Sequence, residues 1–352
     1  MTSRPARSIA FPTATAVLAA LAISAVLLWL AGAPPLEAVN LIFEGAFGSA
    51  DKTANTLMAW TPLVLASASL VVTFAAGMWN IGVEGQVVMG AIAATFVARE
   101  MPGPAWAVVP VTIVAGAVGG AFWAWLAGVL RTKANVNEIF GGLGLDFLAV
   151  GLTTYLIIGP WARAGTASTS GTDIFREETW LPTTSMFGAE LPLLAVSLAL
   201  AATVLVYYLL RGTRFGLRLK AVGKSPRSAF LLGIPNDRYI VGAFLIGGAL
   251  AGVGGTVQAT GFHNKLVPAI SGGYGFLGIL VVLLAGFSAR WIAPIALFFI
   301  ALSVGSTALE LRLGLDSAFG GVIQGVIVLF VMFGTAYALV RRGRAGAEEW
   351  EP

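Results

Sequence analysis

The segment "NIGVEGQVVMG" (Asn80–Gly90) is a polar, glycine-rich insertion in one of the most apolar parts of the chain. It follows "TPLVLASASLVVTFAAGMW" (61–79) and precedes "AIAATFV" (91–97). A charged side chain at membrane depth costs about 3 kcal/mol, and such a group is tolerated mainly where it faces a protein interior or a wet cavity. The segment therefore predicts a broken membrane helix whose polar groups face protein or water.

The composition excludes an ordinary soluble domain. Of the 352 residues, 57% are hydrophobic and only 11% are charged, whereas soluble domains carry about 25% charged residues. The apolar runs are long and continuous, unlike the short alternating segments of membrane barrels. The sequence therefore predicts an all-α integral membrane protein. With no cysteine and His263 as the single histidine, it offers neither a thiolate nor a multi-histidine metal site.

About ten segments are apolar and long enough to be candidate membrane helices, since a spanning helix needs roughly 20 residues. They lie at about 11–31, 55–78, 83–98, 105–130, 139–159, 190–210, 239–260, 272–288, 292–310 and 319–340. The first could be read as a signal peptide, but its apolar run is longer than usual for one. We expect it to stay as an uncleaved helix.

The distribution of Lys and Arg predicts the orientation of these ten spans. If the N-terminus is cytoplasmic, only six of the 21 basic residues fall outside. These six are Lys52, Arg99, Arg163, Arg176, Lys265 and Arg312. The excess on the inner side predicts a multi-pass protein with both termini in the cytoplasm.

We expect one transmembrane domain over residues 1–352. Its parts are a first span with an outer loop (1–54), a first repeat (55–159), an outer loop (160–189), a linking span with a long cytoplasmic loop (190–238), a second repeat (239–340) and a cytoplasmic tail (341–352). Each repeat contains a glycine-interrupted segment, and the two start on opposite sides of the membrane. This pattern favours two inverted repeats, with a substrate path where the broken helices face each other. The alternative is that both segments are only glycine-rich packing faces.

The polar residues of the opening segment leave two interpretations open. Asn80 and Glu84 are four apart and share a helix face. Either they line or support a polar pathway together with Gln86, or Glu84 is a satisfied packing residue that ties two broken helices or lies near the inner surface. Asp146 is expected to cap a helix or pair near Arg131 or Lys133, and a direct role in substrate binding is the alternative.

Other ionisable residues within the spans are few. Glu310 and Arg312 fall at a helix end, where their charged groups can reach the membrane surface. No chain of buried acids and no arginine-rich helix is present. This disfavours a proton-driven pump and a voltage sensor.

The two long loops have different characters. The outer loop 160–189 is rich in Thr, Ser and Gly, and it either packs over the outer mouth, receives a partner or is a solvated connector. The inner loop 211–238 has seven basic residues and one acid, Asp237. Its Ser225-Pro226 pair is a helix-start signal, which predicts a short helix at about 226–232. Either this helix docks into a partner or the loop lies on anionic lipid headgroups.

The tripeptide "GKS" (Gly223–Ser225) in this loop is not a phosphate-binding P-loop. That motif needs a glycine five positions before the first glycine of GKS, and Arg218 stands there. We therefore expect no ATP binding by this chain; if ATP drives it, another subunit supplies the ATPase.

Four stretches together resemble one family. They are "NIGVEGQVVMGAIAA" (80–94), "NVNEIFGGLGLDFLAVGL" (135–152), "TRFGLRLKAVGKSPRSAFLLGI" (213–234) and "SGGYGFLGILVVLLAG" (271–286). Over about residues 55–340 the chain resembles the permease subunits of bacterial ABC importers of the branched-chain amino acid, ribose and nucleoside group. The best resemblance is to the nucleoside and simple-sugar branch, the guanosine or purine-nucleoside permeases.

This resemblance implies a membrane-spanning permease subunit, not an enzyme, in the bacterial cytoplasmic (inner) membrane. It would form the translocation path for a nucleoside, such as guanosine, delivered by an extracytoplasmic substrate-binding protein or lipoprotein. The implied partners are a second permease, homologous or identical, cytoplasmic ABC ATPase subunits that hold ATP and Mg, and membrane lipid, with no nucleic acid. No cofactor is expected in this chain. The alternatives are a permease for a simple sugar such as ribose, and a stand-alone secondary transporter.

The resemblance also assigns candidate residues. Those of the substrate pathway are Asn80, Glu84, Gln86, Gln258 and Tyr274. Those that couple to the ATPase are Arg218, Lys224, Ser225, Pro226, Arg227, Phe230 and Leu231. One departure is that the family often reads "TLMLNYIA" where this chain has "GLGLDFLA" (142–149), so Asp146 replaces an asparagine.

Overall fold

The computed structural model describes residues 7–163, 170–186, 188–316 and 318–348. The chain is mostly helical and is a multi-pass membrane protein, as its composition predicts. Within the described residues, six helical segments are long and apolar enough to cross a membrane: 50–75, 105–133, 138–158, 193–212, 236–262 and 289–313. A seventh is possible if the pair 15–30 and 35–47, bent by 100°, forms one span. The count of ten spans stays a prediction.

The chain divides into two compact units. Unit 1 combines the two ends of the chain, Met1–Thr53 and Phe298–Pro352, and unit 2 is the continuous segment Ala54–Leu297. Every candidate site residue lies in unit 2.

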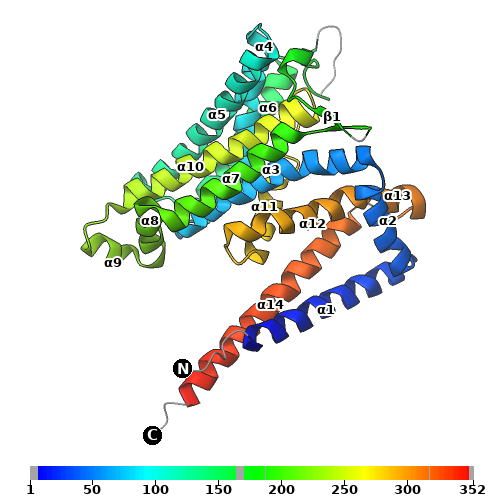
Figure 1. Ribbon diagram of the computed structural model, residues 1–352. Helices are drawn as coiled ribbons and strands as arrows, with labels where there is room; N and C mark the ends of the chain where they lie inside the picture. The colour runs from blue at the N-terminus through cyan, green and yellow to red at the C-terminus, as the bar shows by residue number, and fades with distance from the viewer. Residues whose placement is uncertain (1–6, 164–169, 187, 317, 349–352) are drawn as a thin grey trace. The chain divides into compact units, whose positions relative to one another are not determined.

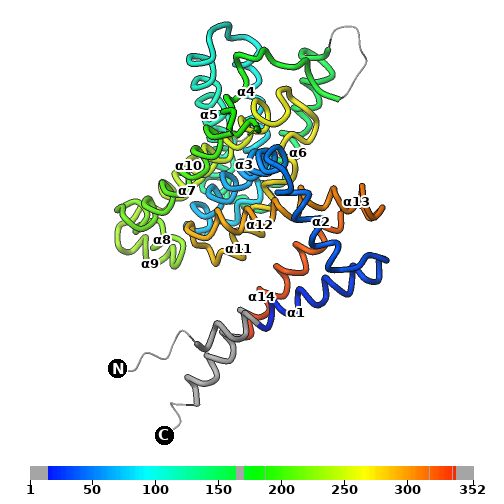
Figure 2. The backbone as a smooth tube through the Cα atoms, turned by 45° about the vertical axis from the view of Figure 1, so that its right-hand side comes forward, coloured from blue at the N-terminus to red at the C-terminus, as the bar shows by residue number. Residues whose placement is uncertain are grey.

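Unit 1 consists of two helix pairings. Helices α1 (Arg7–Leu30) and α14 (Phe319–Glu348) lie side by side in both views (Figures 1 and 2). Helix α2 (Pro35–Phe47) packs against α13 (Thr307–Leu313). The ten predicted segments do not include α2, although Pro35 at its first turn is a recognised helix-start signal. Its buried residues Ala38, Ile42 and Ala46 follow a four-residue spacing, which explains why one stripe is covered.

The centre of unit 2 is a tight helical bundle. Its helices are α3 (Ala50–Ala75, from Ala54), α4 (Val83–Glu100), α5 (Ala105–Lys133), α6 (Glu138–Ile158), α7 (Leu193–Gly212), α8 (Arg214–Lys224), α9 (Pro226–Leu231), α10 (Asn236–Val257), α11 (Tyr274–Leu284) and the first part of α12 (Ile292–Gly305). Helices α5 and α10 run side by side with α4 against both (Figure 1). Gly120 and Gly252 meet backbone to backbone, so the helices approach closely at small residues.

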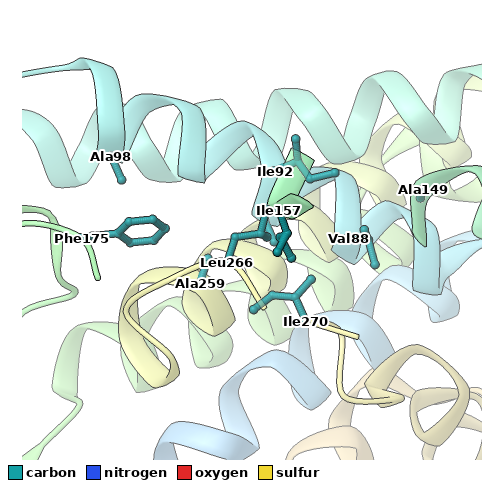
Figure 3. Packing of buried hydrophobic residues seen from close by; sticks show 10 residues of the cluster. Val88, Ile92, Ala98, Ala149, Ile157, Phe175, Ala259, Leu266 and Ile270 are labelled. Atoms are coloured by element: carbon teal, nitrogen blue, oxygen red, sulfur yellow. The ribbon is translucent and has the colours of Figure 1, made fainter. Parts of the chain in front are cut away.

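The outer loop 160–189 is not a simple solvated connector. Its residue Phe175 is buried in an apolar cluster with Ala98, Leu266 and residues of α4, α6 and the segment after α10 (Figure 3). The backbone N–H of Thr172 donates to the oxygen of Leu266 at 2.9 Å, and that of Phe175 to the oxygen of Asn264 at 2.8 Å. The described part of the loop is therefore bound along the chain segment that follows α10.

This loop also contains the β-structure of the described chain. Strands β1 (Thr184–Met186) and β2 (Ala189–Leu191) form an antiparallel hairpin, with Ser185 opposite Glu190. The Thr183 hydroxyl donates to the Glu190 carboxylate at 2.8 Å. Together with the hydroxyl of Ser185, this bond lowers the pKa of that exposed carboxyl. The hairpin is a local addition to an otherwise helical chain.

Candidate functional site

The segment Asn80–Gly90 begins with a non-helical turn between α3 and α4 and continues as the first turns of α4. The backbone turns at 78–82, and the helix begins at Val83. The side chains of Asn80 and Gln86 close this turn with a reciprocal amide pair. Asn80 Nδ2 donates to Gln86 Oε1 at 3.1 Å, and Gln86 Nε2 donates to Asn80 Oδ1 at 2.9 Å. Both side chains are buried, so their polarity is used within the protein.

Glu84 joins α4 to the start of α11. Its carboxylate accepts the backbone N–H of Gly273 at 3.1 Å and that of Gly275 at 2.7 Å. These are donors of the first turn of α11, which the helix itself leaves without acceptors. The side chain of Ser271 also hydrogen-bonds this carboxylate. Glu84 therefore caps the start of α11, although it lies 189 positions before Gly273 in the sequence.

The approach of the two helix starts depends on a glycine. A Cβ atom at Gly275 would lie 2.8 Å from the Glu84 nitrogen and would collide with the Glu84 carboxylate. Gly273, the residue before α11, has a φ of +75°, the left-handed conformation that glycine adopts without strain. The sequence "SGGYG" (271–275) thus provides both the turn and the space for the cap.

The start of α4 has a carboxylate of its own. Asp146, from α6, accepts the backbone N–H of Gly85 at 2.7 Å through Oδ1. Its other oxygen, Oδ2, is buried and has no hydrogen-bond partner among the described residues. Of the two roles expected for Asp146, capping a helix is confirmed. Pairing near Arg131 or Lys133 is wrong, because Arg131 pairs with Glu138 at 3.1 Å and Lys133 with Asp237 at 3.0 Å.

The two helix starts therefore share one electrostatic arrangement. A helix N-terminus carries a partial positive charge, and a carboxylate there is stabilising by about 0.3–2 kcal/mol. Glu84 provides it for α11 and Asp146 for α4. This geometry agrees with the interpretation that Glu84 ties two broken helices.

Gln258 and Tyr274 border the same glycine turn. Gln258 begins a π-helical segment (Gln258–Phe262) at the end of α10, and such segments often occur at functional sites. A Cβ atom at Gly272 would lie 3.3 Å from Gln258 Nε2 and 3.6 Å from the Tyr274 ring. Gln258 is buried and its Oε1 has no partner among the described residues, whereas Tyr274 is half-buried. The five pathway candidates thus gather around the starts of α4 and α11.

Sequence reasoning expected Asp146 to cap a helix as one alternative, but it did not identify α4 as the helix. No spacing rule connects Asp146 to Gly85, which is 61 residues earlier. The available signal was its position as an acid in a span predicted to be apolar. Ser271 was missed, although it lies directly beside the two glycines of the turn.

The candidate coupling residues lie on α8 and α9. Ser225 caps α9, since its Oγ accepts the backbone N–H of Ser228 at 3.3 Å, and Pro226 is the first helical residue. The predicted helix 226–232 is confirmed as Pro226–Leu231. Phe230 is 71% and Leu231 is 78% exposed, so no other part of the described chain packs over these two apolar side chains of α9.

The basic candidates are also at the surface. Arg227 and Lys224 are exposed, and Arg218 donates to the Tyr239 hydroxyl at 3.1 Å. The tripeptide Gly223–Ser225 lies at the junction of α8 and α9. It therefore lacks the strand–loop–helix setting of a P-loop.

Comparison with known proteins gives one consistent result. Residues 52–332 match the family model described as "Branched-chain amino acid transport system / permease component". The chain is 34% identical to the glucose ABC transporter permease protein TsgB13 of Haloferax volcanii, covering 94% of this chain and 88% of that protein. It is 27% identical to the guanosine ABC transporter permease protein NupP of Bacillus subtilis, over 92% of each chain. A third relative is the nucleoside ABC transporter permease protein NupB of Lactococcus lactis, at 27% identity over 88% of this chain and 86% of that protein.

A solved structure supports the fold alone. The chain aligns with a chain of PsaBC from Streptococcus pneumoniae in complex with Fab at 14% identity and a TM-score of 0.50, covering 86% of this chain and 99% of that one. The matched family model spans most of the sequence, and it includes both broken helices and the loop with α8 and α9. The chain therefore belongs to the family of branched-chain amino acid transport system permease components, which are ABC transport subunits rather than enzymes.

Proposed function

We propose that the chain is the membrane-spanning subunit of an ATP-driven importer and forms part of its translocation path. The observation that carries this proposal is the buried polar junction of α4 and α11 inside an apolar bundle. In transporters with internal repeats, the substrate passes where discontinuous helices meet. Asn80, Glu84, Gln86, Gln258 and Tyr274 then support or line the path.

The proposed architecture is ten spans with two inverted repeats, 55–159 and 239–340, within one permease domain. Helices α4 and α11 would be the corresponding broken segments. An α-helix rises about 1.5 Å per residue, so the 11 residues of α11 reach about half of a hydrocarbon core of ~30 Å. The excess of basic residues on one side supports cytoplasmic termini.

Helices α8 and α9 are the proposed contact with the ATPase subunits. An exposed Phe230–Leu231 surface next to basic Arg227 and Lys224 is suited to a protein groove with acidic edges. The remaining proposed partners are a second permease, homologous or identical, and an extracytoplasmic substrate-binding protein. ATP and Mg would be held by the ATPase, with no cofactor in this chain.

A nucleoside, with guanosine as the first candidate, is the proposed substrate, because the four quoted stretches resemble nucleoside permeases and two of the three relatives above are named for nucleosides. A simple sugar is the second candidate. It is favoured by the 34% identity to a glucose permease, which exceeds the 27% identity to NupP.

Uptake into proteoliposomes tests this function. The chain is reconstituted with candidate ATPase, second-permease and binding-protein subunits from the same organism, and labelled guanosine, ribose and glucose are compared. We expect uptake only with ATP and the binding protein. Uptake by this chain alone, driven by a sodium or proton gradient, would instead identify a secondary transporter.

The coupling role has a separate test. Arg218→Glu combined with Lys224→Glu should abolish ATP-driven uptake while the purified chain keeps its helical content. The control is Arg238→Glu with Arg290→Glu, which makes the same charge change at two exposed arginines outside α8 and α9. Equal uptake by both double variants would remove α8 and α9 from the coupling mechanism.

A further inference from the structure

A pocket of about 390 Å³ lies at the basic end of unit 2, apart from the junction of α4 and α11. It is an open pocket lined by the C-terminal ends of α3 and α7, by α8 and by the turn after α11, and Figure 1 shows α8 beside the ends of α3 and α7. Its lining residues are Val71, Phe74, Ala75, Tyr207, Leu210, Arg211, Lys220, Gly223, Lys224, Phe287, Ser288 and Ala289. The set includes three cationic residues and no acidic one.

Two of the cations are held in place by neutral groups. Lys220 Nζ donates to the backbone oxygen of Leu210 at 2.7 Å. Arg211 Nη1 donates to the Tyr207 hydroxyl at 3.0 Å, and its guanidinium carbon lies 5.2 Å from the centre of the Tyr207 ring. Within the described part of the chain, neither cation forms an ion pair with a carboxylate. Their positive charge is therefore available to an external anion.

The other wall of the pocket is apolar. Phe74 and Phe287 meet edge to face with ring centres 5.6 Å apart. Val71 and Leu210 also line this side, and both side chains are buried. The pocket thus combines a cationic side with an aromatic and aliphatic side, which fits a molecule with an anionic head and an apolar body.

We propose that this pocket binds one anionic phospholipid, with its phosphate at Arg211, Lys220 and Lys224 and the start of its acyl chains against Phe74 and Phe287. Basic pockets between membrane helices bind anionic lipid headgroups. Both α3 and α7 are long and apolar enough to cross a membrane, so their ends place the pocket at the level where headgroups lie. A carboxylate of a docked protein would match the cations but not the aromatic wall.

A lipid bound in this pocket would also affect the orientation of α9. Only Ser225 separates α8 from α9. A phosphate held by Lys220 and Lys224 on α8 would therefore fix the direction in which the exposed α9 projects. Lipid binding itself does not depend on which solute the protein carries.

Lipid retention measured by native mass spectrometry tests the proposal. The full chain is purified from nanodiscs of phosphatidylcholine with a minor fraction of phosphatidylglycerol, and we expect phosphatidylglycerol to be retained in excess of its share. The variant Arg211→Gln/Lys220→Gln should reduce this retention about 25-fold, since each basic residue contributes a factor of about five to anionic lipid binding.

The matched control is Arg214→Gln/Arg238→Gln, which removes two positive charges that do not line the pocket. It should retain phosphatidylglycerol as the unmodified chain does, and circular dichroism confirms that both variants are folded. Equal retention by the two double variants would overturn the proposal. It would also be overturned if inorganic phosphate bound the chain but phosphatidylglycerol was not retained above its share. A third contrary result would be a pocket variant that loses ATPase binding but retains as much phosphatidylglycerol as the unmodified chain.

Discussion

Two helix starts in unit 2 are capped in opposite ways. Helix α9 is capped locally, by Ser225 on the nitrogen of Ser228 three residues later. Helix α11 is capped by Glu84, which is 191 residues before the Gly275 nitrogen that it accepts. The exposed start needs only a neighbouring hydroxyl because water satisfies the remaining donors. The start of α11 is largely covered by protein, so its backbone donors need an acceptor from the chain itself, and Glu84 of another helix supplies it.

The largest expected effect is at Glu84. Glu84→Ala leaves the N–H groups of the half-buried Gly273 and the buried Gly275 without their acceptor, which should cost ~3 kcal/mol of unfolding free energy. Glu84→Gln keeps one acceptor oxygen and should lose less stability. Thermal unfolding in detergent measures the difference.

The variant Glu84→Gln also separates a structural role of this residue from a role in transport. If Glu84 also supports the pathway, Glu84→Gln should insert in the membrane normally and still impair uptake. A fully active Glu84→Gln would leave this residue with the structural role alone.

The next effect is at Gly275, where the two helix starts come closest. Gly275→Ala places a methyl group against Glu84 and should destabilise unit 2 by about 1–3 kcal/mol, the usual cost of overpacking. The control is Gly144→Ala in α6, where no atom lies within 4 Å of the added Cβ. The melting temperature should fall in the first variant and stay level or rise in the second. If both melt alike, the close contact at Gly275 is refuted.

At Asp146, two variants separate the role of the Oδ1 acceptor from the role of the negative charge. Asp146→Asn keeps the Oδ1 acceptor for Gly85 and should change stability by less than about 1 kcal/mol, whereas Asp146→Leu removes the acceptor and should cost about 1–3 kcal/mol. Chemical denaturation of the purified chain distinguishes them. A larger loss in the asparagine variant would mean that the negative charge itself is required.

The smallest expected effect is at the exposed start. Ser225→Ala should cost about 1 kcal/mol locally, the typical value for an N-cap, and Ser225→Asp should restore it. Hydrogen exchange of residues 226–232 measures this directly. The melting temperature of the bundle should not move, and a shift as large as that of Glu84→Ala would show that the two starts do not differ in kind.

The helices were predictable to the extent that their signals are local. The apolar runs predicted most of the membrane helices, and Ser225-Pro226 predicted α9 within one residue of its observed end. Helix α2 was missed because, at 13 residues, it is shorter than a span and carries two acids. The hairpin β1–β2 was missed because its three-residue strands give no recognisable alternation.

The candidate site was predictable only in part. Asn80, Glu84 and Gln86 were identified as a group because polar residues in a membrane segment are costly, and this cost can be read from the sequence. Of the two roles expected for Asp146, the helix cap was right and the ion pair was wrong. The sequence could not identify the capped helix, because a backbone donor on another helix leaves no local signal. Tyr274 came from the family resemblance, and Gln258 was named as a candidate without any pattern around it.

The sequence by itself determined that this protein is a helical membrane protein. It also determined where the helices are interrupted by polar, glycine-rich segments and which short segment forms the exposed helix α9. These properties depend on residues within a few positions of one another. Only the tertiary structure decided that Glu84 caps α11, that Asp146 caps α4 and that Arg211 and Lys220 face one pocket. The physical reason is that a buried donor must find an acceptor somewhere in the folded chain, and the acceptor's distance along the sequence does not enter that requirement.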